Sequence, residues 1–174
     1  MRRIYLIKPE GGKRPISIPT IKDRAIQALY LMGLDPVAET IGDTHSYGFR
    51  VHRSAADAVS QIFITLARRD APQWILEGDI KKCFDEIDHH WLKNSIPMEK
   101  SILNKWLRSG FVERRMLHPT IAGTPQGGII SPVLANLTLD GLDDVFNKHF
   151  GKKGTKKRKK YGVHMIRYAD DFIV

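Results

Sequence analysis

Two apolar segments that end in aspartate constrain this sequence most. Trp74-Ile-Leu-Glu-Gly-Asp79 has the composition of a strand with its carboxylate at the far end, and residues 163–174 are typical of a strand, a two-residue Asp170-Asp171 turn and a second strand. Adjacent like charges in a turn raise each other's cost of ionisation unless a cation neutralises them. The pattern therefore predicts carboxylates that bind hard divalent ions such as Mg²⁺, with simple turn capping by each aspartate as the alternative.

The remaining patterns mix strands and helices, which predicts an α+β chain. A hairpin is expected from residues 3–7 and 15–18 around a turn at 9–12, flanked by Lys8 and Arg14. Apolar spacing and N-terminal capping residues predict core-facing helices over 21–33, a short one restarting at Asp35-Pro36, and others over 55–66, 89–95, 99–109 and from Ser131 through Phe146.

A strong positive charge indicates a polyanionic partner, with nucleic acid first among the candidates. The 174 residues carry 28 Lys and Arg against 19 Asp and Glu, a formal net charge of +9. Seven of the nine residues from Lys152 to Lys160 are basic. This run is expected to be a solvated loop insertion, and a contact to template or intron RNA phosphates is the alternative.

The cysteine and histidine patterns exclude several kinds of site. Cys83 is the single cysteine, so an intrachain disulfide framework is excluded and a reducing, cytoplasmic compartment is expected. The histidines lack the spacing of a zinc site. No apolar run is long enough to span a bilayer, so no membrane partner is expected. Cys83, Trp74 and Trp106 are predicted to be core residues.

Four stretches occur together in one order: His45-Ser-Tyr-Gly-Phe-Arg50, Gly78-Asp-Ile-Lys-Lys-Cys-Phe-Asp85, Thr124-Pro-Gln-Gly-Gly-Ile-Ile-Ser-Pro-Val-Leu-Ala-Asn136 and Arg167-Tyr-Ala-Asp-Asp-Phe172. In these stretches the chain resembles reverse transcriptases, most closely those encoded by group II introns. After Arg50 the family usually has Pro-Gly where this chain has Val51-His52, which leaves the role of that loop open.

The resemblance implies the fold of a right-hand polymerase. We expect fingers over about 1–73 and a palm over 74–174, with some finger elements around 95–123. The palm is expected to be an antiparallel sheet backed by helices. The chain stops three residues past the Asp170-Asp171 pair, so the thumb is expected to be absent, the palm truncated after the catalytic hairpin, and activity of this portion alone weak or missing.

The resemblance also implies the roles of particular residues. Asp79, Asp170 and Asp171 would be catalytic and would bind two Mg²⁺ ions, with Mn²⁺ as a substitute and the carbonyl of Ile80 as a further ligand. The nucleotide-binding residues would be Lys8, Arg14, Phe84, Gln126 and Gly127. Among these, Phe84 would exclude ribonucleotides from the space beneath the sugar, and core packing is its alternative.

The function implied is RNA-directed DNA polymerisation, the transfer of a nucleotide from a dNTP to a primer 3′ hydroxyl, in the service of intron mobility. Its partners would be an RNA template, a DNA primer, dNTP and intron RNA. The alternative is a non-catalytic RNA-binding maturase or splicing module with the same fold. The sequence leaves the oligomeric state and the cognate intron undetermined.

Overall fold

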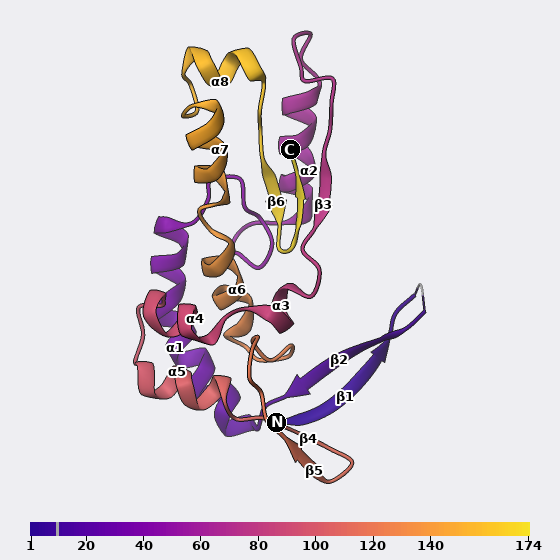
Figure 1. Cartoon of the computed structure of the whole chain (residues 1–174), viewed down its shortest axis with the longest axis vertical. Helices are drawn as coiled ribbons and strands as arrows, with labels where there is room; N and C mark the ends of the chain where they lie inside the picture. Colours follow the sequence, from indigo (N-terminus) through magenta and orange to yellow (C-terminus); the bar gives the residue numbers. More distant parts are fainter. Residues whose placement is uncertain (10) are drawn as a thin grey trace. The chain divides into compact units, whose positions relative to one another are not determined.

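The computed structural model describes residues 1–9 and 11–174, and its contacts define two compact units. Unit 1 comprises Met1–Ala38 and Lys82–Thr138, and unit 2 comprises Glu39–Lys81 and Leu139–Val174. Each unit contains one β-sheet with its own helices (Figure 1). The division into fingers and palm stays a prediction.

The sheet of unit 1 begins with the expected hairpin. Strands β1 (Arg2–Ile7) and β2 (Lys13–Ile18) pair antiparallel in a register that sets Leu6 opposite Arg14. Glu10, in the predicted turn, lies outside the described residues. A second hairpin, β4 (Phe111–Glu113) and β5 (Met116–His118), completes the order β2-β1-β4-β5. Sequence reasoning missed it because its turn puts Arg114 and Arg115, and not glycine or asparagine, at positive φ.

Helix α1 (Ile21–Ile41) runs through Pro36, so the predicted break at Asp35-Pro36 is wrong. A proline inside a helix costs about 3 kcal/mol because it lacks an N–H donor and its ring crowds the preceding turn. Leu34 and Ala38, on either side of Pro36, pack into or against the hydrophobic core. Burial on both sides of Pro36 offsets that cost.

The core of unit 1 is formed by short helices around α1. These are α3 (Cys83–Glu86), α4 (His89–Ser95), α5 (Lys100–Leu107) and α6 (Ser131–Leu139), of which α4 has the predicted bounds. Leu92, Leu103 and Leu107 are almost completely excluded from solvent. Trp106 packs edge-on against Tyr30 with ring centroids 5.4 Å apart, and Cys83 is buried. The predicted core positions of Trp106 and Cys83 are confirmed.

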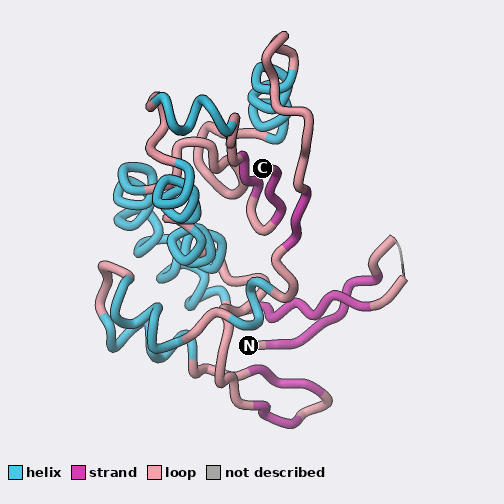
Figure 2. The backbone as a smooth tube through the Cα atoms, turned by 45° about the horizontal axis from the view of Figure 1, so that its top comes forward, coloured by secondary structure: helices cyan, strands magenta, loops and turns pink. Residues whose placement is uncertain are grey.

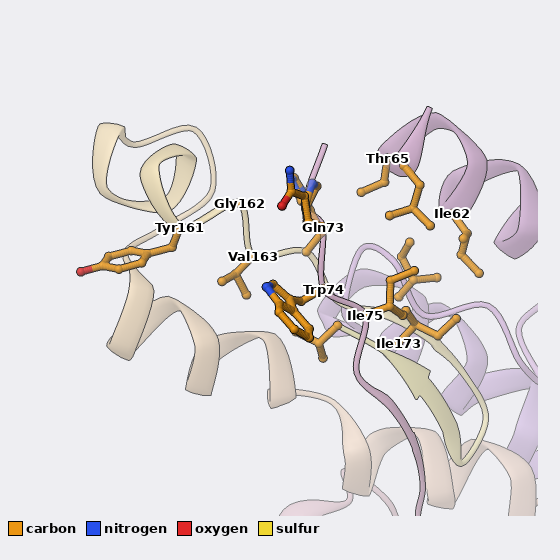
Figure 3. Close-up of a pocket in the computed structure, with 14 residues that line it drawn as sticks. Ile62, Thr65, Gln73, Trp74, Ile75, Tyr161, Gly162, Val163 and Ile173 are labelled. Atoms are coloured by element: carbon orange, nitrogen blue, oxygen red, sulfur yellow. The ribbon is translucent and has the colours of Figure 1, made fainter. Parts of the chain in front are cut away.

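The sheet of unit 2 has the order β3-β7-β6, with every pair antiparallel. Its strands are β3 (Glu77–Asp79), β6 (Ile166–Tyr168) and β7 (Asp171–Ile173), drawn in magenta in Figure 2. The tight turn lies at Ala169-Asp170, one residue earlier than predicted, and Asp171 already belongs to β7. Figure 3 shows Trp74, which is 89% exposed, so its predicted core position is wrong.

Helix α2 (Ala55–Leu66) has the predicted N-terminus but not the predicted burial. Ser54 and Asp57 form a reciprocal capping box at its start. Ala58 is buried within unit 2, whereas Val59 and Phe63 are mostly exposed. Periodicity identifies an apolar face, but only packing partners decide whether the face is covered.

The segment after Ser131 forms two helices in place of the single one predicted. The first is α6, and Gly141, with a φ of 95°, separates it from α7 (Leu142–Phe150). The basic run is also not a plain solvated loop, because Thr155 caps a helix, α8 (Lys156–Tyr161), in which Arg158 is buried. Within the described residues no helix combines the length and apolar character needed to cross a membrane.

Candidate functional site

The predicted carboxylates gather on the sheet of unit 2. Asp79, at the end of β3, lies opposite Asp171 in the β3–β7 ladder. The N–H of Ile80 donates to the carbonyl oxygen of Asp170 at 3.1 Å. The turn therefore folds back beside the end of the Asp79 strand, which brings together the carboxylates that the sequence predicted to bind a divalent ion.

The carboxylates affect one another electrostatically. Burial raises the pKa of Asp171, and the negative charges of Asp170, Asp79 and Glu77 raise it further. Asp79 and Asp171 are exposed to solvent. Closely spaced, accessible carboxylate oxygens are the donors that Mg²⁺ prefers. The donor chemistry therefore fits the expected ion, although no three His, Cys, Asp or Glu side chains in residues 1–9 and 11–174 converge into a ready-made metal cluster.

The motif His45–Arg50 packs against the turn that carries Asp170, and the role of Val51-His52 after it stays open. Ala169 occupies the turn at a φ of 56°, an unusual conformation for a residue with a side chain. Gly48 lies so close that a Cβ added to it would overlap the backbone nitrogen of Ala169. Glycine is required at position 48 because the backbone of the turn occupies the space of a side chain.

Arg167 fixes the same turn from within unit 2. Its side chain is fully buried, and its guanidinium donates to the carbonyl of Ala169 at 3.1 Å and to Oδ1 of Asp140 at 2.7 Å. Its backbone N–H donates to the carbonyl of His45, and its carbonyl accepts from Tyr47. A planar guanidinium with several fixed donors orients neighbouring backbone more strictly than an ammonium group does. The residue before Tyr168 thus positions the aspartates that follow it.

Two more arginines rigidify the loop that contains this motif. Arg50 and Arg53 both form ion pairs with Glu39, and Arg50 also donates to the carbonyl of Asp43 at 2.7 Å. Partial burial raises the pKa of Glu39, but the hydrogen bonds from Arg50 and Arg53 outweigh it and lower the pKa overall. The carboxylate of Glu39 is therefore ionised at neutral pH and anchors the loop.

The predicted nucleotide-binding residues lie in unit 1. Lys8 and Arg14 are exposed on the β1–β2 hairpin, and Arg14 is held in register opposite Leu6. Within the described part of the chain neither cation has an ion-pair partner, so both remain available to an anion.

The loop with Gln126 and Gly127 is bonded to β2. The N–H of Ser17 donates to the carbonyl of Gln126 at 2.6 Å. Gly127 has a φ of 117°, and a Cβ there would lie 2.8 Å from the carbonyl oxygen of Ser17. The glycine therefore has a structural reason, close approach to β2, besides the substrate approach that the sequence suggested. The side chain of Gln126 lies 3.5 Å from Oδ1 of Asp85.

Phe84 is partly buried and packs against the hydrophobic core of unit 1. Its carbonyl accepts a 2.7 Å hydrogen bond from Thr124, which ties α3 to the Gln126 loop. This packing supports the alternative that Phe84 is a core residue. Its role in excluding ribonucleotides stays a prediction.

Sequence reasoning did not identify Gly48, Asp140 and Arg167 as residues that shape the site. A signal was present for two of them, since Gly48 lies within one of the four recognised stretches and Arg167 begins another. Asp140 follows α6 in a segment that looked like continuous helix. Nothing local indicated that it would accept a hydrogen bond from a distant arginine.

Comparison with known proteins agrees with these features. The family model described as reverse transcriptase (RNA-dependent DNA polymerase) matches residues 6–174. The group II intron-encoded protein LtrA of Lactococcus lactis subsp. cremoris is 39% identical over 152 residues, which cover 82% of this chain and 24% of that protein.

Two further relatives have similar coverage. An uncharacterized 91 kDa protein in the cob intron of Schizosaccharomyces pombe is 36% identical over 168 residues, covering 91% of this chain and 20% of that protein. Protein YkfC of Escherichia coli K12 is 29% identical over 202 residues, covering 99% of this chain and 53% of that protein. The chain thus spans about half, or less, of the length of these relatives.

Proposed function

The chain belongs to the reverse transcriptase (RNA-dependent DNA polymerase) family, and we propose that it catalyses template-directed transfer of deoxynucleotides to a primer 3′ hydroxyl. The observation that carries the proposal is the pairing of Asp79 with Asp171 beside the Asp170 turn. Phosphoryl transfer of this kind needs positioning and charge neutralisation more than covalent catalysis, and closely placed carboxylates are suited to that task.

The carboxylates are proposed as the metal-binding part of the enzyme. Asp79, Asp170 and Asp171, with the carbonyl of Ile80, would hold two Mg²⁺ ions, which Mn²⁺ can replace. When bound, such ions make the primer hydroxyl a better nucleophile and neutralise charge on the triphosphate. Burial and the like charges of Asp170, Asp79 and Glu77 raise the pKa of Asp171, and a bound cation would relieve the repulsion among these charges.

The nucleotide-binding part is proposed for residues of unit 1. Arg14 offers a planar guanidinium that can bind phosphate oxygens in a bidentate manner, and Lys8 adds a point charge on the same hairpin. Gln126 and Gly127 would contact the incoming nucleotide, and Phe84 would exclude a 2′ hydroxyl by its volume. The partners proposed are an RNA template, a DNA primer, dNTP and intron RNA, in a cytoplasmic setting.

Primer extension with an aspartate variant tests the proposal. In the complete open reading frame that encodes this chain, Asp79→Asn should abolish extension of a DNA primer on an RNA template and leave RNA affinity nearly unchanged, because it removes a metal ligand and no phosphate contact. Asp144→Asn, an equal change at an exposed position of α7, is the matched control and should retain activity. Extension by Asp79→Asn at the native rate would refute the mechanism.

A non-catalytic RNA-binding module is the second candidate. The net charge of +9 favours it, because a positive surface binds RNA phosphates without any catalysis. If this candidate were correct, the native protein would bind intron RNA and promote splicing without extending any primer in Mg²⁺ or Mn²⁺. The Asp79→Asn variant would then splice as well as the native protein.

A further inference from the structure

A basic cavity of about 520 Å³ lies within unit 2, and none of the three proposed metal-binding aspartates is among its lining residues. Its walls come from the end of α2, the segment that follows α2, the loop before α8, and α8 itself. Thr65, Gly162 and Val163, labelled in Figure 3 around a neighbouring apolar pocket, line both spaces. The ionisable residues in its walls are His45, Arg68, Asp70, Lys153, Arg158 and His164.

The side chain of Arg158, in the wall of the cavity, is held in place by burial and by polar contacts. It is buried, its Nε donates to the carbonyl of Val163 at 2.7 Å, and its Nη2 lies 3.3 Å from Oδ1 of Asp143. Lys153 uses the same carboxylate, with Nζ 2.9 Å from Oδ2. The carboxylate of Asp143 thus forms ion pairs with two cations. Arg68 has no ion-pair partner in the described part of the chain.

Burial and neighbouring charges act on the two histidines that line the cavity. Burial lowers the pKa of His45, and the charge of Lys153 lowers it further. Burial also lowers the pKa of His164, together with the charges of Arg158, Arg68 and Lys153. Asp143 opposes the shift at both rings without reversing it. Arg68, Lys153 and Arg158 line the cavity with Asp70, and Asp143 pairs with two of these cations, so three positive charges stand against two negative ones.

We propose that this cavity binds a phosphate group, either a phosphodiester of an RNA strand or a free phosphate ion. Arg68, Lys153 and Arg158 all line it, and guanidinium and ammonium groups form strong charge-assisted hydrogen bonds to phosphate oxygens. A bound anion offsets the mutual repulsion of these cations. It also favours protonation of His45 and His164, which adds two further donors.

The contribution of Asp70 gives the proposal a directional test. Asp70 lines the cavity, and a negative charge at this position repels an anion. Removing that charge must therefore strengthen phosphate binding, whereas removing Arg68 and Lys153 must weaken it. A change in general stability cannot produce opposite effects of this kind.

The experiment is an NMR titration of the histidine ring resonances in the whole chain. Sodium phosphate is the first probe and a single-stranded oligoribonucleotide with hydroxyl ends is the second. Phosphate should raise the pKa of His45 and His164. Arg68→Gln with Lys153→Gln should weaken binding about tenfold or more, and Asp70→Asn should strengthen it about threefold. Lys156→Gln, on the same basic run but outside the cavity, is the matched control and should change affinity little.

The two probes identify the source of the phosphate. A response of both rings to the oligoribonucleotide alone assigns the site to RNA, a response to sodium phosphate alone assigns it to the free ion, and a response to both supports a shared site. The proposal is overturned if neither probe moves the rings, or if Lys156→Gln weakens binding as much as the double variant.

Discussion

The two units of this protein are stabilised by different interiors. Unit 1 buries a continuous apolar cluster in which Leu92, Leu103 and Leu107 are almost inaccessible to solvent. In unit 2 the largest fully buried side chain is Arg167, and Arg158 is buried as well. Apolar contacts are non-directional, whereas each buried arginine needs specific acceptors at specific distances.

The difference follows from what each interior supports. The apolar core of unit 1 supports α3 and the Gln126 loop, and non-directional contacts are enough for this support. The interior of unit 2 must hold a turn at positive φ with two adjacent aspartates. Hydrogen bonds from Arg167 to Ala169 and Asp140 fix both position and orientation there. Unit 2 should therefore tolerate conservative substitution less well than unit 1.

The largest expected effect is the loss of Arg167. Arg167→Met should destabilise unit 2 by about 3–5 kcal/mol, because it leaves the carboxylate of Asp140 buried without its cation. Arg167→Lys should also be clearly destabilising, since an ammonium cannot reproduce the guanidinium's separate bonds to Ala169 and Asp140. Urea denaturation measures both. If Arg167→Lys is as stable as the native protein, unit 2 needs only a positive charge at this position. The proposed difference between the two units would then be wrong.

The matched change in unit 1 is Leu103. Leu103→Ala should cost about 2–5 kcal/mol because it leaves a cavity in the core. Leu103→Met should cost less than about 1.5 kcal/mol, because it keeps the volume and needs no directed bonds. The same denaturation experiment checks these values, and a Leu103→Met cost equal to that of Arg167→Lys would remove the distinction between the units.

Smaller effects are expected from alanine substitutions at two glycines, one in a crowded place and one with open space around it. Gly48→Ala should destabilise by about 1–3 kcal/mol and reduce primer extension, because the new Cβ overlaps the backbone of Ala169. Gly33→Ala, in α1 with open space around it, should stabilise by about 0.5–1 kcal/mol. Thermal unfolding of both variants measures the shifts, and equal shifts of the same sign would contradict this account of Gly48.

The smallest effect concerns pH and the histidines of unit 2. Burial and neighbouring cations lower the folded pKa of His45 and His164 below the ordinary value of 6.5. Between the folded-state and the unfolded-state pKa of these histidines, the unfolded chain binds more protons than the folded chain. The free energy of unfolding therefore rises with pH in that window, and this stability is lost as the pH falls through it. The charged groups that act on these rings are Arg53, Arg68, Asp143, Lys153 and Arg158, and His164 also acts on His45.

Melting temperatures measured between about pH 5 and 8 test this effect. His45→Gln with His164→Gln should flatten the slope below pH 6.5, whereas His90→Gln, on α4 in unit 1, should leave it unchanged. A slope that persists in the double variant would show that other groups cause the acid sensitivity.

The sequence by itself determined the family and the features that depend on neighbouring residues. The β1–β2 hairpin, the Ser54–Asp57 capping box and helix α4 follow from turn residues, caps and periodicity within short windows. The aspartates were found in the same way, because Asp79 and the Asp170-Asp171 pair each lie at the end of a recognisable apolar segment. Their shared role in binding a divalent ion was inferred from carboxylate chemistry.

Tertiary structure decided what depends on distant partners. The sequence could not show that α1 continues through Pro36, that Trp74 is exposed while Trp106 is buried, or that Arg158 leaves the basic run to enter the interior. It also could not show that Arg167 joins Ala169 to Asp140. Burial and hydrogen-bond partners come from residues far apart in the chain. A local sequence pattern therefore indicates which environment a side chain favours, and only the tertiary structure provides the contacting residue.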